Sequence, residues 1–137
     1  MSDKDRAFSD PQGGPPAAAP TLSVIAMPAD TNAYGNIFGG WLMSHMDLAS
    51  AQKAMESTGQ DVVTRAASIS FDRPVMVGDK VSFYTDELRT GTTSITIGAV
   101  AWALRRSTHA VEKVGEGEFV FVAIDARKNK TLVARKK

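Results

Sequence analysis

The chain has 137 residues, of which 43% are hydrophobic and 23% charged, and this length and composition fit one globular domain. Its net charge is +1, and no stripe of Lys and Arg interleaved with aromatic residues is present, so binding to nucleic acid is not expected. The chain has no cysteine, which excludes disulfides, a thiol nucleophile and thiolate metal ligands. It also has no long apolar run for a membrane span or an export signal, so we expect a cytoplasmic protein.

The first part of the chain, residues 1–20, is polar and then rich in Pro, Gly and Ala, which predicts a disordered arm before a folded domain at 21–137. In that domain we expect a strand at 21–27, a turn-rich loop at 28–36 and one long helix at 37–58. Four more strands are predicted, joined by loops of hairpin length, at 62–72, 79–89, 92–105 and 117–125. This order predicts an α+β fold in which the helix covers one face of an antiparallel sheet.

The second turn of the predicted helix contains a carboxylate, Asp47. At about 100° per residue, the polar residues His45, Gln52 and Glu56 lie roughly 140 to 180° around the helix from it. Asp47 is therefore expected on the buried side, in a stripe of small or apolar residues that comprises Gly40, Met43, Ser44, Ser50, Ala51 and Ala54. A carboxylate there costs several kcal/mol unless it is paired, protonated or faces a wet cavity. Asp47 is thus either a functional residue or an acid paired with a backbone amide or an arginine.

The glycine pair Gly39 and Gly40 stands at the predicted start of this helix. A helix N-terminus offers unpaired N–H groups and the positive end of the helix dipole, and glycine lets a ligand approach closely. The alternative is a tight turn that packing requires. A triad of Ser44, His45 and Asp47 is excluded because His45 lies roughly 160° around the helix from Asp47, so the three side chains cannot converge. His45 is expected in solvent. With two histidines and no cysteine, a catalytic zinc site is not expected either.

Three segments carry a family resemblance: "MPADTNAYGNIFGGWLMSHMD", "SISFDRPVMVGDKV" and "GEFVFVAID". In this order and at these distances they resemble the hotdog-fold acyl-CoA thioesterases, most closely the bacterial YciA-like acyl-CoA hydrolases. The resemblance extends from Thr21 to about Asp125. It implies a long central helix wrapped by a curved antiparallel sheet, and subunits that pair into homodimers and often into trimers of dimers. The implied reaction is hydrolysis of acyl-CoA thioesters without a cofactor.

The resemblance also implies roles for individual residues. Asp47 would be the catalytic carboxylate, Asn32 would position water or substrate, and the backbone N–H of Gly40 or Gly39 would polarise the thioester carbonyl. The basic residues that we consider for the phosphates of coenzyme A are Arg73, Arg105, Arg106, Arg127, Lys128 and Lys130. A non-catalytic module of the same fold that binds acyl-CoA or an acyl carrier remains the alternative, because fold alone does not establish activity.

The spacing of Gly40 and Asp47 predicts a dimer. These residues are seven positions apart in one helix, or about 10 Å along its axis. One thioester carbonyl cannot be reached by both, because its oxygen must lie about 3 Å from the N–H donor and its carbon close to the acid. Two antiparallel helices across a two-fold axis close this gap, and we therefore predict an active site shared between the subunits of an obligate homodimer.

Overall fold

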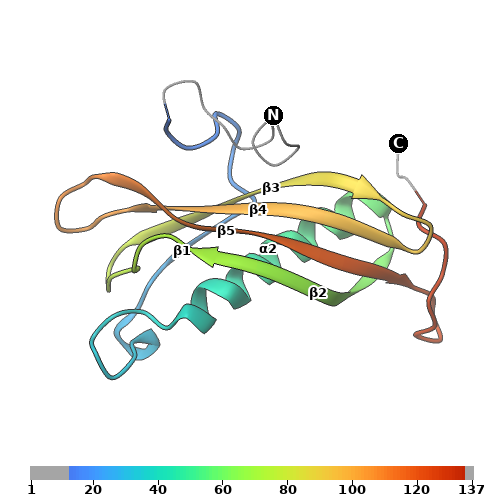
Figure 1. Ribbon diagram of the computed structural model, residues 1–137, viewed down its shortest axis with the longest axis horizontal. Coiled ribbons are helices and arrows are strands. Elements are labelled where there is room, and N and C mark those ends of the chain that lie inside the picture. Colours follow the sequence, from blue (N-terminus) through green and yellow to red (C-terminus); the bar gives the residue numbers. More distant parts are fainter. Residues whose placement is uncertain (1–12, 135–137) are drawn as a thin grey trace.

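The computed structural model describes residues 13–134, which form one long helix against one face of a curled five-stranded antiparallel sheet (Figure 1). The elements in chain order are β1 (Leu22–Ile25), the 3-10 turn η1 (Pro28–Asp30), α2 (Gly39–Thr58), β2 (Asp61–Phe71), β3 (Lys80–Thr90), β4 (Ser94–Leu104) and β5 (Val111–Ile124). The predicted α+β class is confirmed. The helix begins two residues later than predicted, because Ile37 and Phe38 donate their N–H groups to the carbonyls of Val75 and Asp30. Within residues 13–134 no helix has the length and apolar character to cross a membrane.

The strand order across the sheet is β1-β3-β4-β5-β2. The hairpins β3–β4 and β4–β5 agree with the predicted loops, since both pairs are antiparallel neighbours. The short connection at 72–79 is not a hairpin, because β5 is the strand that pairs with β2, whereas β3 pairs with β1 and β4. Strand β2, eleven residues long, therefore lies at an edge of the sheet with β5 as its hydrogen-bonded neighbour.

Strand β5 is longer than predicted, because it begins at Val111 rather than at residue 117. Gly115 in this missed stretch lowers the expectation of a strand, and Gly117 is the first residue of the predicted one. In the structure they sit where β2 approaches most closely: a Cβ on Gly117 would lie 2.7 Å from the Ser68 carbonyl oxygen, and one on Gly115 would lie 3.1 Å from that of Ser70. The glycines thus permit the sheet to curl tightly around the helix.

The core lies between α2 and the concave face of the sheet. The fully buried large side chains include Phe83, Phe119, Phe121, Met46, Ile95 and Ile97. His45, which we predicted to be solvated, is half-buried against this core, with its ring 6.0 Å from that of Phe83 and 4.5 Å from that of Trp41 between centroids. Its Nδ1 lies 2.8 Å from the Trp41 carbonyl oxygen, which satisfies the polar edge and lets the apolar ring edge pack inward.

The two ends of the chain differ in how they are held. Residues 1–12 of the predicted arm lie outside the described residues, and residues 13–20 contain neither helix nor strand. After β5, the Gln60 side-chain amide binds the C-terminal segment twice: Nε2 donates to the Leu132 carbonyl and Oε1 accepts from the Ala134 N–H, each at 2.9 Å. The segment is therefore fastened beside the end of α2.

Candidate active site

Asn32 begins the tight loop that leads into the helix. Its Oδ1 accepts hydrogen bonds from the N–H groups of Tyr34 at 2.9 Å and Asn36 at 3.1 Å, and its own N–H donates to the Asn36 carbonyl at 2.6 Å. Gly35 has a φ of 85° in this turn, a conformation that favours glycine. Because the side-chain oxygen is used by the loop, the amide nitrogen of Asn32 is the end that can donate to a ligand.

The helix start is open to a ligand. No side chain caps α2, since Phe38 occupies the N-cap position without a side-chain hydrogen bond. The N–H groups of the first turn and the positive end of the dipole are therefore unscreened by a capping side chain. A Cβ on Gly40 would have no atom within 4 Å, and the φ of Gly40 is not in the left-handed region. Packing within this chain does not require Gly40 to be a glycine, which argues against the packing alternative.

A cavity of about 310 Å³ lies beside this helix start. The loop before the helix contributes Asn32 to its wall, the first turn contributes Gly39, and the segment after β2 contributes Arg73 and Pro74. Its volume is at the lower end of the range for small-molecule sites. Of the residues predicted for the site, the cavity brings together Asn32, Gly39 and Arg73.

Asp47 lies on the flank of α2 that faces β2. Its Oδ1 accepts a hydrogen bond from Thr64 Oγ1 at 2.6 Å, so its partner is neither a backbone amide nor an arginine. The predicted stripe around it is divided, with Gly40, Met43 and Ser44 exposed, Ala51 half-buried, and Ser50 and Ala54 buried. The prediction that Asp47 points into the buried side of the helix is wrong for the single chain, where its side chain is half-buried. The helix instead turns the face with Leu42 and Met46 towards the core.

Thr64 is the site residue that sequence reasoning missed. Its position depends on a β-bulge in β2 at Arg65, where the register with β5 shifts between Thr64 and Ala66. Before the bulge the even-numbered residues face the helix, and after it the odd-numbered Ile69 and Phe71 do so. The bulge lets one strand present Thr64 to Asp47 and still pack an apolar side chain further along. The change of alternation in VVTRAASISF is the sequence signal that could have indicated it.

Asp47 does not line the cavity that contains Asn32 and Gly39. Gly40 and Asp47 both lie within α2, as predicted, so about 10 Å along the axis separates them. One chain therefore contains the two parts of the candidate site, an N–H donor region and a carboxylate, at a distance that a single thioester cannot bridge.

The predicted basic residues occupy different environments. Arg73 and Arg106 are exposed, whereas Arg105 is buried, with a side chain 10% exposed. Arg105 Nη1 donates to Asp79 Oδ2 at 2.7 Å and to the Pro74 carbonyl at 2.8 Å. Burial lowers the pKa of Arg105, but its hydrogen bonds to Glu112 and Asp79 outweigh this and hold the pKa above its ordinary value. These contacts give Arg105 a structural role within the fold, so we no longer assign it to the phosphates of coenzyme A.

The remaining polar groups of the helix do not form another catalytic centre. Ser44 Oγ donates to the Trp41 carbonyl at 3.1 Å, and His45 Nδ1 shares the same acceptor, so neither bonds to Asp47. Across residues 13–134 no cluster of three or more His, Asp and Glu side chains is arranged to hold a metal ion. His109 lies in the turn between β4 and β5, with a φ of 62°.

The known proteins that are similar to this chain agree with one another in family. Residues 34–110 match the family model of the thioesterase superfamily. An uncharacterized acyl-CoA thioester hydrolase of Zymomonas mobilis is 48% identical over 113 residues, which is 80% of this chain and 74% of the relative. The acyl-CoA thioester hydrolase YciA of Escherichia coli K12 is 44% identical over 108 residues, which is 76% of this chain and 82% of YciA.

A solved structure extends the likeness to the fold. The hexameric broad-specificity acyl-coenzyme A thioesterase HI0827 superimposes with a TM-score of 0.83 at 36% identity, covering 95% of this chain and 90% of that one. The family model matches more than half of the chain, and the curated relatives match it over most of their own length. The chain therefore belongs to the hotdog-fold thioesterase superfamily, among the YciA-like acyl-CoA thioester hydrolases.

Proposed function

We propose that this protein hydrolyses acyl-CoA thioesters to free coenzyme A and a carboxylic acid, at a site shared between two subunits. Asp47 acts on the thioester carbon, as a general base that activates water or as a nucleophile. The N–H of Gly40, with Gly39 beside it, binds the carbonyl oxygen as negative charge develops. The amide nitrogen of Asn32 orients the substrate or the water.

One observation carries this proposal: α2 presents both an oriented carboxylate and an uncapped N-terminus next to a cavity. Thr64 holds Oδ1 of Asp47 at 2.6 Å, which leaves Oδ2 for a water or a thioester carbon. At the other end, open space around Gly40 allows a carbonyl oxygen to approach the N–H groups. Thioester hydrolysis needs these two functions together, an oxyanion donor and a base or nucleophile.

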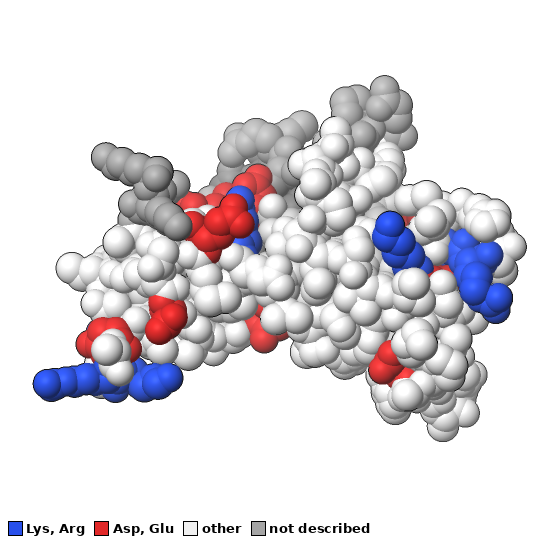
Figure 2. Space-filling view, turned by 180° about the vertical axis from the view of Figure 1, so that it is seen from behind, with Lys and Arg blue, Asp and Glu red and all other residues white. Residues whose placement is uncertain are grey.

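A two-fold dimer supplies the missing proximity. Strand β2 lies at an edge of the sheet, and the neighbouring flank of α2 exposes Met43, Leu48 and Met55, which are 43%, 50% and 41% exposed. The face seen in Figure 2 has a largely uncharged middle, with charged side chains at both ends and acidic ones also along its upper and lower margins. Pairing of two β2 edges would place the helices antiparallel and bring Gly40 and Asn32 of one chain towards Asp47 of the other. The name of HI0827 describes a hexamer, and we propose that the dimers assemble further as trimers.

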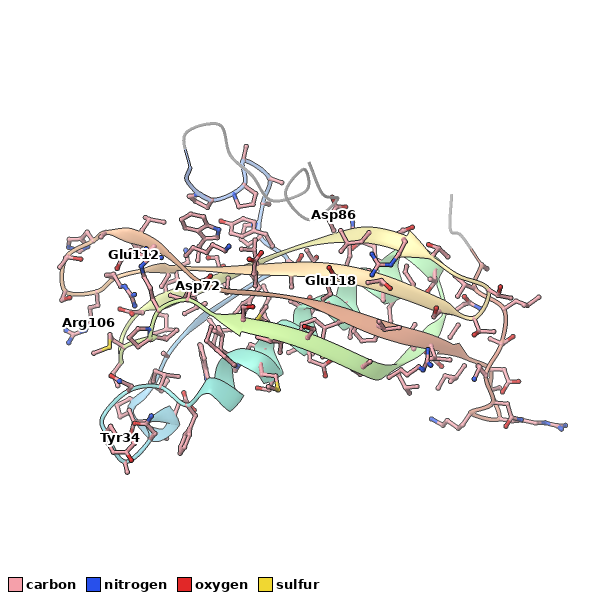
Figure 3. The ribbon with its side chains drawn as sticks, in the orientation of Figure 1. Tyr34, Asp72, Asp86, Arg106, Glu112 and Glu118 are labelled. Atoms are coloured by element: carbon pink, nitrogen blue, oxygen red, sulfur yellow. The ribbon has the colours of Figure 1, made fainter. Side chains whose placement is uncertain are left out.

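The anionic part of coenzyme A requires cationic contacts. Arg73 lines the cavity and is exposed, and Arg106 lies at the same end of the molecule in the turn after β4 (Figure 3). We assign these two arginines to the phosphates and leave Arg105 out, because Asp79 and Glu112 hold it. The cytoplasmic location expected from the sequence stays a prediction.

Hydrolysis of a series of acyl-CoA thioesters, followed by detection of the released thiol, tests the proposal. Asp47→Asn keeps the shape of the side chain but removes the base, and its turnover should fall by about 10² or more. Asp86→Asn is the matched control, because Asp86 is an exposed acid on β3. If the wild-type protein binds acyl-CoA but does not hydrolyse it, the non-catalytic binding module would be favoured.

A further inference from the structure

Glu112, near the start of β5, joins two arginines that come from different segments. Its Oε1 accepts a hydrogen bond from Arg105 Nε at 2.8 Å, and its Oε2 lies 3.6 Å from Arg73 Nε. Arg73 also donates from Nη1 to the Lys113 carbonyl at 2.9 Å. Figure 3 shows Glu112 at the end of the molecule where Asp72 and Arg106 also lie.

The Arg105 side of this network of contacts is held by several hydrogen bonds. Asp79 is 2% exposed, and it accepts hydrogen bonds from Arg105 Nη1 and from the N–H groups of Met76 and Arg106. Arg105 also binds the Pro74 carbonyl, next to Arg73 in the same connection. A buried ion pair with its hydrogen bonds satisfied fixes the position of both partners. Arg105 is therefore a firm support for Glu112.

The Arg73 side of the network is open to solvent. The side chain of Arg73 is 51% exposed and lines the cavity beside Asn32 and Gly39. Its charge is only partly compensated, because Glu112 is shared with Arg105. The contacts of Arg73 to Glu112 and to the Lys113 carbonyl use Nε and Nη1, which leaves Nη2 for an anion. A guanidinium N–H is a strong donor to phosphate oxygens.

We infer that Glu112 is a positioning residue, through which the buried Asp79–Arg105 pair holds the Arg73 guanidinium at the cavity for a phosphate of coenzyme A. This inference rests on the proposed substrate. Glu112 itself does not touch the substrate, and its effect on binding passes through Arg73. The carboxylate costs some electrostatic attraction for the phosphate, but it restricts a long side chain that would otherwise lose rotamer freedom on binding.

The first test compares Glu112→Gln with wild type in two equilibrium titrations, one with coenzyme A and one with pantetheine, which lacks the phosphates. We expect the Kd for coenzyme A to rise about two- to five-fold, the range of a half-exposed ion pair, and the Kd for pantetheine to stay unchanged. In turnover, KM for acyl-CoA should rise while kcat stays the same. An unchanged or lower Kd for coenzyme A would overturn the inference, as would an equal rise for both ligands.

The second test is a double-mutant cycle with Arg73→Ala. If Glu112 acts through Arg73, Glu112→Gln should have no further effect on the Kd for coenzyme A in the Arg73→Ala background. A persisting effect would show a general structural role and overturn the inference. Glu118→Gln is the control, since Glu118 forms a 2.9 Å ion pair with Arg89 elsewhere on β5. The titrations do not depend on hydrolysis, so a wild-type protein that binds coenzyme A without turnover would refute the proposed function and leave this inference standing.

Discussion

A mixed dimer of two damaged variants tests the shared site directly. Asn32→Ala removes the orienting amide, and Asp47→Ala removes the carboxylate. These residues belong to the separate parts of the candidate site, because Asp47 does not line the cavity that holds Asn32. In a heterodimer across a two-fold axis, one site receives both lesions and the other receives none. Random pairing gives about half heterodimers, each with one intact site, so about a quarter of wild-type activity should return.

The assay is co-expression of the two variants with different affinity tags, isolation of material that carries both tags, and measurement of thiol release. Each variant alone gives the baseline, and mass analysis verifies the heterodimer. Because we propose trimers of dimers, nearly every hexamer carries both tags under random pairing, and about half of its dimers are mixed. The selected material should therefore also reach about a quarter of wild-type activity. If Asn32 and Asp47 served one site within a chain, every site would be damaged. Activity at the baseline in verified heterodimers would refute the shared site.

Four other perturbations each test one feature of the molecule. Thr64→Val removes the hydrogen bond to the Asp47 carboxylate, and a hydrogen bond to a charged group is worth about 1.5 to 3 kcal/mol. The kcat should therefore fall roughly ten- to a hundred-fold. An unchanged kcat would show that Asp47 is oriented without Thr64. Asp79→Ala leaves the buried Arg105 without its charge partner and should lower the free energy of unfolding in urea by about 3 to 5 kcal/mol. A change below about 1 kcal/mol would show that the Asp79–Arg105 pair does not stabilise the fold. A truncated chain that begins at Pro20 should keep its Tm and activity, since residues 13–19 contribute no helix or strand, and a large loss of either would mean that the arm docks on the domain. Single-turnover hydrolysis in ¹⁸O water should distinguish the two roles of Asp47, because label in its carboxylate would exclude a pure general-base route.

The helix and most strand boundaries were predictable because they depend on local periodicity. Val62, Ile69 and Phe83 mark strands by their side-chain type, and the apolar run after Gly40 marks the helix. The first part of β5, residues 111–116, was missed because Gly115 has low strand propensity, and Gly117 stood at the predicted start. Their role appears only when β2 packs against them, since the reason for each glycine is a neighbouring carbonyl oxygen from another strand.

The side chains of the site were predictable in type but not in environment. Asp47 could be predicted to lie on a different side of the helix from Gln52 and Glu56, yet helical angles could not say which face meets the sheet. His45 was assigned to solvent for being polar, although its ring packs on Phe83 and its Nδ1 finds a carbonyl. Periodicity treats a residue as polar or apolar, whereas a histidine can be both at once.

The fold class, the family and the candidates Asn32, Gly40 and Asp47 follow from the sequence, because they reside in contiguous motifs with local geometry. The hydrogen-bond partners of these groups depend on how distant segments pack together. A bulge in β2 aims Thr64 at Asp47, and the pairing of distant segments buries Arg105 against Asp79. Such contacts join residues 17 and 26 positions apart, and their existence depends on strand register and crossing, which no local pattern in the chain encodes.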